Sequence, residues 1–378
     1  MKKIIKYTGL GLLTIVIAFS AYAVISGRIY LFRAVYHNFA NVDDYKIFEN
    51  NIVQADSIQP FDISKNYGNV VVPDDLNKLL ERTASIAVVV IKNDSLVFEK
   101  YWDGYSDSSY SSSFSVAKTI TAMLIGVALK EGKIRSLQDK VGDYLPEFKE
   151  GDKANVKIID LLTMSSGSNW DESYANPFSV TTEAYYGDDV YKAATGVKII
   201  HKPGTLFEYK SGDTQLLGLI LEKATGKSLS DYASEKLWKP LGAVHAAYWS
   251  TDKKNGNEKA YCCFNSNARD FAKIGSLLLH QGNWKGRQII DSTYCEQAIT
   301  PCMINNAGNN PCTYYGYQLW ILPDRPQIYF ARGILGQYII VVPEKNMVIV
   351  RLGKTVGPRS QNGFPKLVYD LVSWGETL

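Results

Sequence analysis

The sequence predicts an α+β fold, in which one antiparallel sheet built from both ends of the chain is flanked by helices and carries an inserted α-helical subdomain. Two hairpins predict the sheet. The first joins the β-branched run at 86–91 to 96–102, and the second joins 337–342 to 347–352. A further strand is expected at 316–321. Because the stretch between these strands has helical spacing, the order strands–helices–strands favours an α+β fold over a parallel α/β fold.

The helices are expected where apolar residues recur at helical spacing. The strongest pattern is the apolar run at 119–129, which ends at Glu131 and Gly132. Shorter helices are expected at 158–164, 214–224, 268–280 and 365–374. We therefore expect one body at 84–378, with the helical insertion at about 135–310. The stretch from Trp170 to Asp189, rich in tyrosine and acidic residues, is expected to be a loop.

The N-terminus has the pattern of an export signal. Three lysines in the first six residues precede an uncharged stretch from Tyr7 to Gly27. Residues 20–23 resemble a signal-peptide cleavage site, but the apolar run continues beyond them and is long enough to span a membrane. The sequence therefore favours a membrane anchor at 1–27 over a cleaved signal peptide. Either alternative exports the body, which would face the periplasm or the cell exterior, with residues 28–83 as an extension packed on it.

Composition excludes some classes of function. A formal net charge of +3 over 378 residues, without a block of lysines or arginines, argues against a nucleic-acid partner. The five cysteines lack the spacing of a zinc site, so neither a metal nor a cofactor is expected. In an oxidising compartment their odd number fits one or two disulfides and a free thiol, and Cys302 with Cys312 is the preferred pair. The cysteines are Cys262, Cys263, Cys295, Cys302 and Cys312.

The first candidate catalytic element is Ser115 with Lys118, at the start of the apolar helix. A serine hydroxyl needs an adjacent base to become a nucleophile, and a lysine at i+3 lies on the same face of the helix. Burial by the apolar helix would let Lys118 lose its proton near neutral pH. The alternative is a helix-capping serine with a surface lysine. A second Ser-x-x-Lys, from Ser250 to Lys253, is expected to be a solvated turn.

The second element is Tyr209, in the loop before the helix at 214–224. Its pKa is expected to be lowered by a nearby lysine, which would make it a general base. Tyr174, in the aromatic loop, is the alternative. The third element is the stretch 330–337, where Gly333 would let a substrate approach a strand edge whose N–H groups bind an oxyanion. A simple bulge between strands would give the same spacing.

Taken together and in this order, the three elements resemble the serine β-lactamase and penicillin-binding superfamily, class C branch, and within it the 6-aminohexanoate-dimer hydrolases. The resemblance covers about residues 84 to 378. It implies a β-lactamase/transpeptidase-like fold, with Ser115 as the acylated nucleophile, Lys118 as its partner and Tyr209 as the general base. It also places the oxyanion hole at the backbone N–H groups of Ser115 and Ile334.

Two departures from the family pattern bear on the substrate. The triplet whose lysine binds the carboxylate of β-lactams is replaced by residues 331–333, which include Arg332 and Gly333, and Ser211 stands where β-lactamases usually carry asparagine. Penicillin hydrolysis is therefore in doubt unless Arg332 substitutes for the lysine. The expected substrate-binding residues are Ser211, Trp170, Tyr186, Asp188, Arg332 and Gly333.

These patterns lead to the expectation of a serine hydrolase that cleaves an ester or amide of a small substrate through an acyl-enzyme. Two alternatives stay open. One is a β-lactamase or D-Ala-D-Ala carboxypeptidase-like enzyme, and the other is a non-catalytic cell-envelope sensor of the same fold. The sequence does not predict the oligomeric state.

Overall fold

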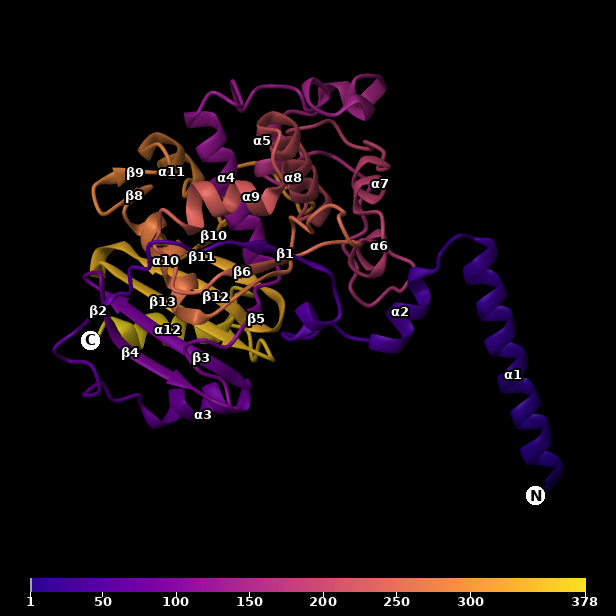
Figure 1. The fold of residues 1–378 in the computed structure, drawn as a ribbon, viewed down its shortest axis with the longest axis horizontal. Coiled ribbons are helices and arrows are strands. Elements are labelled where there is room, and N and C mark those ends of the chain that lie inside the picture. Colours follow the sequence, from indigo (N-terminus) through magenta and orange to yellow (C-terminus); the bar gives the residue numbers. More distant parts are fainter. Residues whose placement is uncertain (1) are drawn as a thin grey trace.

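A seven-stranded sheet forms the centre of the body (Figure 1). The computed structural model describes residues 2–378, with side chains described for all of these except 2–6 and 9. The strand order is β10-β11-β12-β13-β3-β4-β2, and every neighbouring pair is antiparallel except β2 with β4. The strands are β2 (Asp62–Ile63), β3 (Ser85–Lys92), β4 (Ser95–Tyr101), β10 (Trp320–Leu322), β11 (Arg325–Gly333), β12 (Gln337–Val342) and β13 (Met347–Gly353).

The α+β prediction is confirmed, including a sheet assembled from both ends of the chain. One edge of the predicted antiparallel sheet departs from that arrangement, because β2 runs parallel to β4. This strand has only two residues, and both are exposed, so it lacks the alternation of apolar and polar residues that would reveal it in a sequence.

Helices cover both faces of the sheet because its central strands are apolar on both. Val88 and Val90 of β3 belong to one core, and Val89 and Ile91 belong to the other. The helices α4 (Val116–Lys130) and α10 (Ala268–Leu279) cover the Val89 face, and α3 (Asp74–Arg82) and α12 (Lys366–Gly375) cover the Val88 face.

The helical region packs beside the sheet, with α4 as the shared element. The helix α4 contacts β11 and β12 and also packs on α8, which in turn contacts α5 and α7. This places the start of α4 between the sheet and the helical region. The remaining helices are α5 (Ile158–Leu162), α6 (Val180–Tyr186), α7 (Val190–Thr195), α8 (Ser211–Thr225), α9 (Leu229–Ala233) and α11 (Ser292–Ala298). Short 3-10 segments are η1 (Asp44–Lys46), η2 (Val141–Asp143), η3 (Pro146–Phe148), η4 (Gly151–Asn155), η6 (Ile334–Gly336) and η7 (Pro343–Lys345), and η5 (Ser234–Trp238) is π-helical.

A second, four-stranded sheet ties the N-terminal extension to the body. Its order is β1-β6-β7-β5, and its strands are β1 (Asn50–Val53), β5 (Ser111–Ser112), β6 (Ala247–Ser250) and β7 (Phe264–Ser266). A two-stranded hairpin, β8 (Asn283–Trp284) with β9 (Arg287–Gln288), stands apart. Before β1, the helix α2 (Tyr30–His37) packs on α6 of the helical region. The extension therefore contacts the helical region and also the segment that leads into α4, where the Ser112 N–H donates to the Val42 carbonyl at 2.7 Å.

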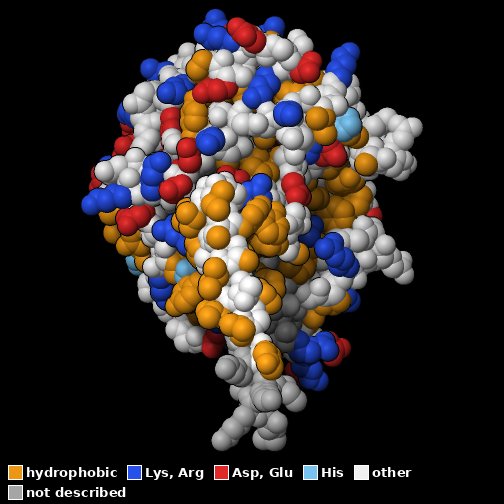
Figure 2. All heavy atoms as spheres, turned by 90° about the vertical axis from the view of Figure 1, so that its right-hand side faces the viewer, with side chains coloured by type: hydrophobic (Ala, Val, Ile, Leu, Met, Phe, Trp, Pro, Cys, Tyr) orange, Lys and Arg blue, Asp and Glu red, His pale blue; other side chains and the backbone are white. Residues whose placement is uncertain are grey.

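The helix α1 (Lys2–Ile25) projects from the body (Figure 1). Hydrophobic side chains gather on the face that carries it (Figure 2), and most of the large apolar side chains at 10–17 are more than half exposed. Among the described residues, no helix combines the length and apolarity needed to cross a membrane. The predicted anchor at 1–27, of which Met1 lies outside the described residues, stays a prediction.

The cysteine pairing differs from the prediction. The disulfide joins the neighbours Cys262 and Cys263, whereas Cys302 and Cys312 are free thiols, as is Cys295. The sequence alone does not reveal that two adjacent cysteines at the end of a buried loop bond to each other. Cys302 and Cys312 do lie close together, because their side chains form a hydrogen bond.

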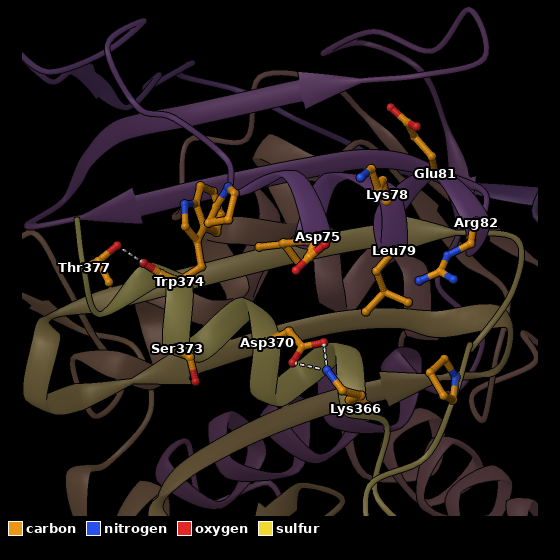
Figure 3. A pocket seen from close by; sticks show the side chains of 13 residues that line it. Asp75, Lys78, Leu79, Glu81, Arg82, Lys366, Asp370, Ser373, Trp374 and Thr377 are labelled. Carbon is orange, nitrogen blue, oxygen red and sulfur yellow. Dashed lines mark hydrogen bonds and ion pairs between the residues drawn. The ribbon is translucent and has the colours of Figure 1, made fainter.

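A groove of about 860 Å³ runs between α3 and α12, on the face of the sheet turned away from α4 (Figure 3). Leu79 and Trp374 line its floor, and the ion pair of Lys366 with Asp370, at 2.6 Å, lies at its edge. Ser115 does not line this groove.

Candidate active site

Ser115 lies at the N-terminus of α4, directly after a tight bend in the chain. Phe114 has a positive φ of 45°, and Ser115 is the N-cap of the helix. An ordinary side chain rarely adopts this φ, so the packing of buried Phe114 must hold the bend in place. Among the described residues no acceptor binds the backbone N–H of Ser115, so this donor is free to bind a developing negative charge.

Lys118 is buried against this serine, and no carboxylate of the described residues forms an ion pair with it. Its Nζ donates to Ser115 Oγ at 3.0 Å, to Ser211 Oγ at 3.0 Å and to the Tyr261 carbonyl at 2.9 Å. The side chain is only 1% exposed, and burial lowers the pKa of Lys118 from 10.5 to about 8. The charged form uses all three protons in these bonds. Loss of one proton leaves a lone pair that can face the hydroxyl of Ser115.

Glu172 is a site residue that the sequence motifs do not identify. Its two carboxylate oxygens accept from the backbone N–H and the hydroxyl of Ser211, both at 2.6 Å, and Tyr174 OH also donates to it at 2.6 Å. Because the Ser211 hydroxyl gives its proton to Glu172, its oxygen is left to accept from Lys118. The negative charge of Glu172 raises the pKa of Lys118 and so opposes the effect of burial.

Tyr209 lies beside Lys118, with the lysine Nζ 5.1 Å from the centre of its ring. The prediction of a lowered tyrosine pKa is wrong. Burial, and then the charge of Glu172, raise the pKa of Tyr209, and the opposing effects of Ser115 and Arg332 are smaller. The phenol is therefore protonated near neutral pH, so that in the free enzyme it is a proton donor, whereas Lys118 is the group whose pKa is suited to a base.

The turn after β11 brings Ile334 into the same cavity as Ser115. This close approach requires glycine at the last position of the strand. A Cβ on Gly333 would overlap the carbonyl oxygen of Ser113, so no larger residue fits between β11 and the bend before α4. Leu335, in the turn, has a positive φ of 61°.

A cavity of about 500 Å³ opens at Ser115. Of the predicted site residues, Ser115, Ser211, Tyr186 and Ile334 line it. The others lie elsewhere. Trp170 is buried against Gly212, and its Nε1 donates to Thr181 Oγ1 at 2.9 Å. The guanidinium carbon of Arg332 lies 5.1 Å from the centre of the Trp320 ring. Asp188 is exposed. Lys118, Tyr209 and Gly333 surround Ser115 without lining the cavity.

The second Ser-x-x-Lys is part of the second sheet. Ser250 is fully buried in β6, and its hydroxyl donates to Asn50 Oδ1 at 2.8 Å, so the expectation of a solvated turn is wrong at this residue. Lys253 is exposed, and the Ser250 hydroxyl bonds Asn50 and Asn265 instead. The two copies of the motif therefore differ in whether the lysine reaches the serine.

Two parts of the site lie outside the predicted residues, namely Glu172 and the wall formed by residues 34–40. Glu172 falls in the tyrosine- and acid-rich loop, but nothing in the loop distinguishes it from the other acids. Tyr174, the predicted alternative to Tyr209, lies in the same loop, lines the cavity and donates to Glu172. The wall of the cavity formed by residues 34–40 has no sequence motif at all. Within the described part of the chain, no cluster of three or more His, Cys, Asp or Glu side chains is arranged to hold a metal ion.

Comparison with known proteins identifies the family of the chain. Residues 74–367 match the Beta-lactamase family. The chain is 26% identical to 6-aminohexanoate-dimer hydrolase of Paenarthrobacter ureafaciens over 305 residues, which cover 76% of this chain and 77% of that protein.

Solved structures show the same fold. A candidate 6-aminohexanoate-dimer hydrolase from Bacillus anthracis superposes with a TM-score of 0.77 at 25% identity, covering 89% of this chain and 94% of that one. A family VIII carboxylesterase superposes with a TM-score of 0.63 at 16% identity, covering 83% and 98%, and this likeness concerns the fold alone. The chain belongs to the Beta-lactamase family and is a hydrolase of that fold.

Proposed function

We propose that the protein is a serine hydrolase that cleaves an ester or amide bond of a small substrate through an acyl-enzyme. The observation that carries this proposal is the 3.0 Å contact between Lys118 Nζ and Ser115 Oγ, made by a lysine whose pKa burial lowers to about 8. A buried lysine with no carboxylate in contact is costly unless its neutral form is used.

In the acylation step, Ser115 Oγ attacks the substrate carbonyl carbon while neutral Lys118 takes the hydroxyl proton. The N–H groups of Ser115 and Ile334 stabilise the oxyanion of the tetrahedral intermediate. When this intermediate collapses, the bond from carbon to the leaving oxygen or nitrogen breaks, and protonated Tyr209 donates the proton that the leaving group requires. Tyr209 then regains a proton from Lys118.

In the deacylation step, water attacks the acyl-enzyme and gives a proton to the Lys118–Tyr209 pair. The bond from the acyl carbon to Ser115 Oγ breaks, Ser115 recovers its proton, and the carboxylic acid leaves. The net reaction adds one water across the ester or amide bond. It needs neither a metal nor a redox partner.

We favour esters and linear amides over β-lactams as substrates. The P. ureafaciens relative is named for the hydrolysis of a linear amide dimer. Arg332, the only cation in the replaced triplet, lies beside Trp320 and does not line the cavity at Ser115. A β-lactam carboxylate in this cavity would therefore lack a charged partner.

The test combines a fluorophosphonate probe, intact-mass detection and a substrate panel. Wild type is expected to gain one probe adduct and to hydrolyse short p-nitrophenyl esters, with little or no turnover of the cephalosporin nitrocefin. Ser115→Ala is expected to lose the adduct and at least about 1,000-fold in kcat/KM. Equal labelling of the two proteins would rule out Ser115 as the nucleophile, and rapid nitrocefin turnover would contradict the preference for esters and amides.

We also propose that the protein is exported and held at a membrane by its N-terminal segment. The support is the sequence order of three lysines followed by an uncharged stretch to Gly27. Fractionation of expressing cells, with N-terminal sequencing of the recovered protein, tests this proposal and separates an anchor from a cleaved signal.

A further inference from the structure

We propose that the cavity at Ser115 is a pocket for uncharged, apolar acyl groups, and that residues 34–40 of the N-terminal extension form its outer wall. This inference rests on the proposed function and specifies its substrate class. It predicts a preference for medium-chain acyl esters over substrates with charged ends.

The lining of the cavity carries no charge. None of its 19 residues is acidic or basic, and most are apolar or aromatic, among them Phe39, Ala40, Phe114 and Leu335. A volume of about 500 Å³ lies within the range of small-molecule sites and far exceeds an acetyl group. An apolar acyl chain would gain free energy from burial here, whereas an ammonium or carboxylate would lose its hydration without a partner.

The two charged groups beside the Ser115 and Ser211 end of the cavity are bonded to protein atoms. The carboxylate of Glu172 already accepts bonds from Ser211 and Tyr174. Lys118 is 1% exposed and its three bonds go to protein atoms. A substrate that carries charge on its acyl part would therefore enter a neutral site.

The placement of Tyr209 indicates which half of the substrate occupies the cavity. Tyr209 is the proposed proton donor to the leaving group, and it lies beside Lys118 rather than in the cavity lining. Ile334, which supplies an oxyanion N–H, and Leu335 do line the cavity. The leaving group therefore departs toward Tyr209, and the acyl chain extends from Ser115 toward residues 34–40.

The outer wall is held in place by the body. Tyr185, which lines the cavity, donates its hydroxyl proton to Asp44 Oδ2 at 2.7 Å. The ring of His37 stacks on Tyr186 with centroids 6.1 Å apart. Buried Lys259 bonds the Tyr185 carbonyl and lies 4.0 Å from the ring centre of Phe48 in the extension. These contacts tie both ends of the segment 37–48 to α6. The wall residues within this segment are therefore a fixed part of the pocket.

The experiment measures kcat/KM for p-nitrophenyl esters from acetyl to decanoyl, each below its micellar concentration. We expect a rise of roughly threefold to fourfold per added methylene over the short chains, followed by a fall once the chain exceeds the cavity. A second series keeps the acetyl group and lengthens the alcohol, and it should show a much weaker dependence. The zwitterionic 6-aminohexanoate dimer should be a poorer substrate than an uncharged N-acyl amide of similar length.

Two matched variants test the wall. Phe39 and Tyr36 are exposed by 75% and 84% and lie three residues apart, but only Phe39 lines the cavity. Phe39→Ala is expected to reduce the ratio of octanoyl to acetyl kcat/KM at least threefold, and Tyr36→Ala is expected to keep the wild-type ratio. The ratio of long-chain to short-chain labelling rates of Ser115 by alkyl fluorophosphonates should likewise fall in Phe39→Ala and stay at the wild-type value in Tyr36→Ala.

Three results would overturn the inference while the proposed function stands: an acyl-chain profile that is flat or falls from acetyl onward, the same ratio in Phe39→Ala and wild type, or faster cleavage of the zwitterionic dimer. Dependence on the alcohol alone would place the leaving group in the cavity and would also overturn it. Loss of the proposed function looks different, because no ester is then hydrolysed and no probe labels Ser115.

Discussion

The pKa values of the neighbouring side chains Lys118 and Tyr209 are shifted in opposite directions. Burial disfavours the charged form of each group, so it lowers the pKa of the lysine to about 8 and raises that of the tyrosine. The negative charge of Glu172 raises the pKa of both groups. The result is an assignment of roles at neutral pH, with the lysine as the group that can accept a proton and the tyrosine as the group that can donate one.

The pH profile follows from this assignment. Since acylation requires neutral Lys118, kcat/KM should rise with pH through about 8 and then level off, because the fraction of neutral lysine grows as pH increases past its pKa. In Glu172→Gln the charge that raises the lysine pKa is removed, so the rising limb should move to lower pH. The measurement is kcat/KM for one ester between pH 6 and 10.

Asp188→Asn provides the control for this prediction. Asp188 is an exposed acid of the same region and is not among the groups that shift the pKa of Lys118. Removal of the Asp188 charge should leave the rising limb of the pH profile in place and should change kcat/KM by no more than about twofold. If the rising limb stays fixed or moves to higher pH in Glu172→Gln, the charge of Glu172 does not raise the pKa of Lys118. A large loss in Asp188→Asn would restore the sequence prediction that Asp188 binds substrate.

At the scale of elements, the turn that presents Ile334 is held by an arginine from the neighbouring strand. Arg351 of β13 is fully buried, and its Nη1 donates to the carbonyls of Leu335 at 3.1 Å and Gly336 at 2.7 Å. Its other bonds reach the carbonyls of Thr355 and of Thr83, the C-cap of α3, and the hydroxyl of Ser85 at the start of β3. One guanidinium thus joins η6 to two strands, a geometry that the single ammonium of lysine cannot reproduce.

Arg351→Lys is therefore expected to reduce both stability and catalysis. It leaves several buried carbonyls without a donor, which should cost about 3 kcal/mol of unfolding free energy. The turn should then hold Ile334 less precisely, and kcat/KM should fall at least about tenfold. The measurements are thermal unfolding and the rate at which a fluorophosphonate labels Ser115.

The labelling rate separates positioning from stability. Arg325→Lys is the matched control, because Arg325 pairs with Glu376 and is partly exposed. It should change the unfolding temperature by no more than about 2 °C and should leave labelling unchanged. If Arg351→Lys is less stable but labels at the wild-type rate well below its unfolding temperature, Arg351 has only a structural role.

At the scale of the whole molecule, sequence reasoning succeeded where the relevant geometry is local. Ser115 and Lys118 share a helix face because three residues make nearly one turn, and the apolar run around them predicts burial of the lysine. The strands at both ends were predicted because β-branched runs of six residues have few alternative conformations. These features depend only on neighbours in the chain.

The rest depends on contacts between segments that are distant in sequence. Glu172 reaches Ser211 across 39 residues, and residues 34–40 meet Ser115 only through packing of α2 on α6. The raised pKa of Tyr209 follows from burial and from Glu172, neither of which its own segment reveals. The pairing of Cys262 with Cys263 likewise depends on loop conformation.

The N-terminal segment provides the last test, because its two halves relate differently to the body. Contacts of α1 with the body involve Phe19, whose ring lies 5.9 Å from that of Phe32, and Ala23, which is fully buried. Residues 10–18 are exposed. A variant that starts at Phe19 should thus unfold within about 2 °C of the full chain and keep its acyl-chain profile. If the segment is an anchor, the same variant should move from the membrane fraction to the soluble fraction of expressing cells.

A variant that starts at Asn50 should behave differently, because it removes the wall at 34–40 and uncovers Tyr185 and Lys259. Its unfolding temperature should fall by several degrees, and its preference for longer acyl chains should be lost while Ser115 is still labelled. Differential scanning fluorimetry and the ester series measure both effects. An unchanged profile in this variant would show that the pocket is complete without the extension, and a changed profile in the variant that starts at Phe19 would show that the wall extends into α1.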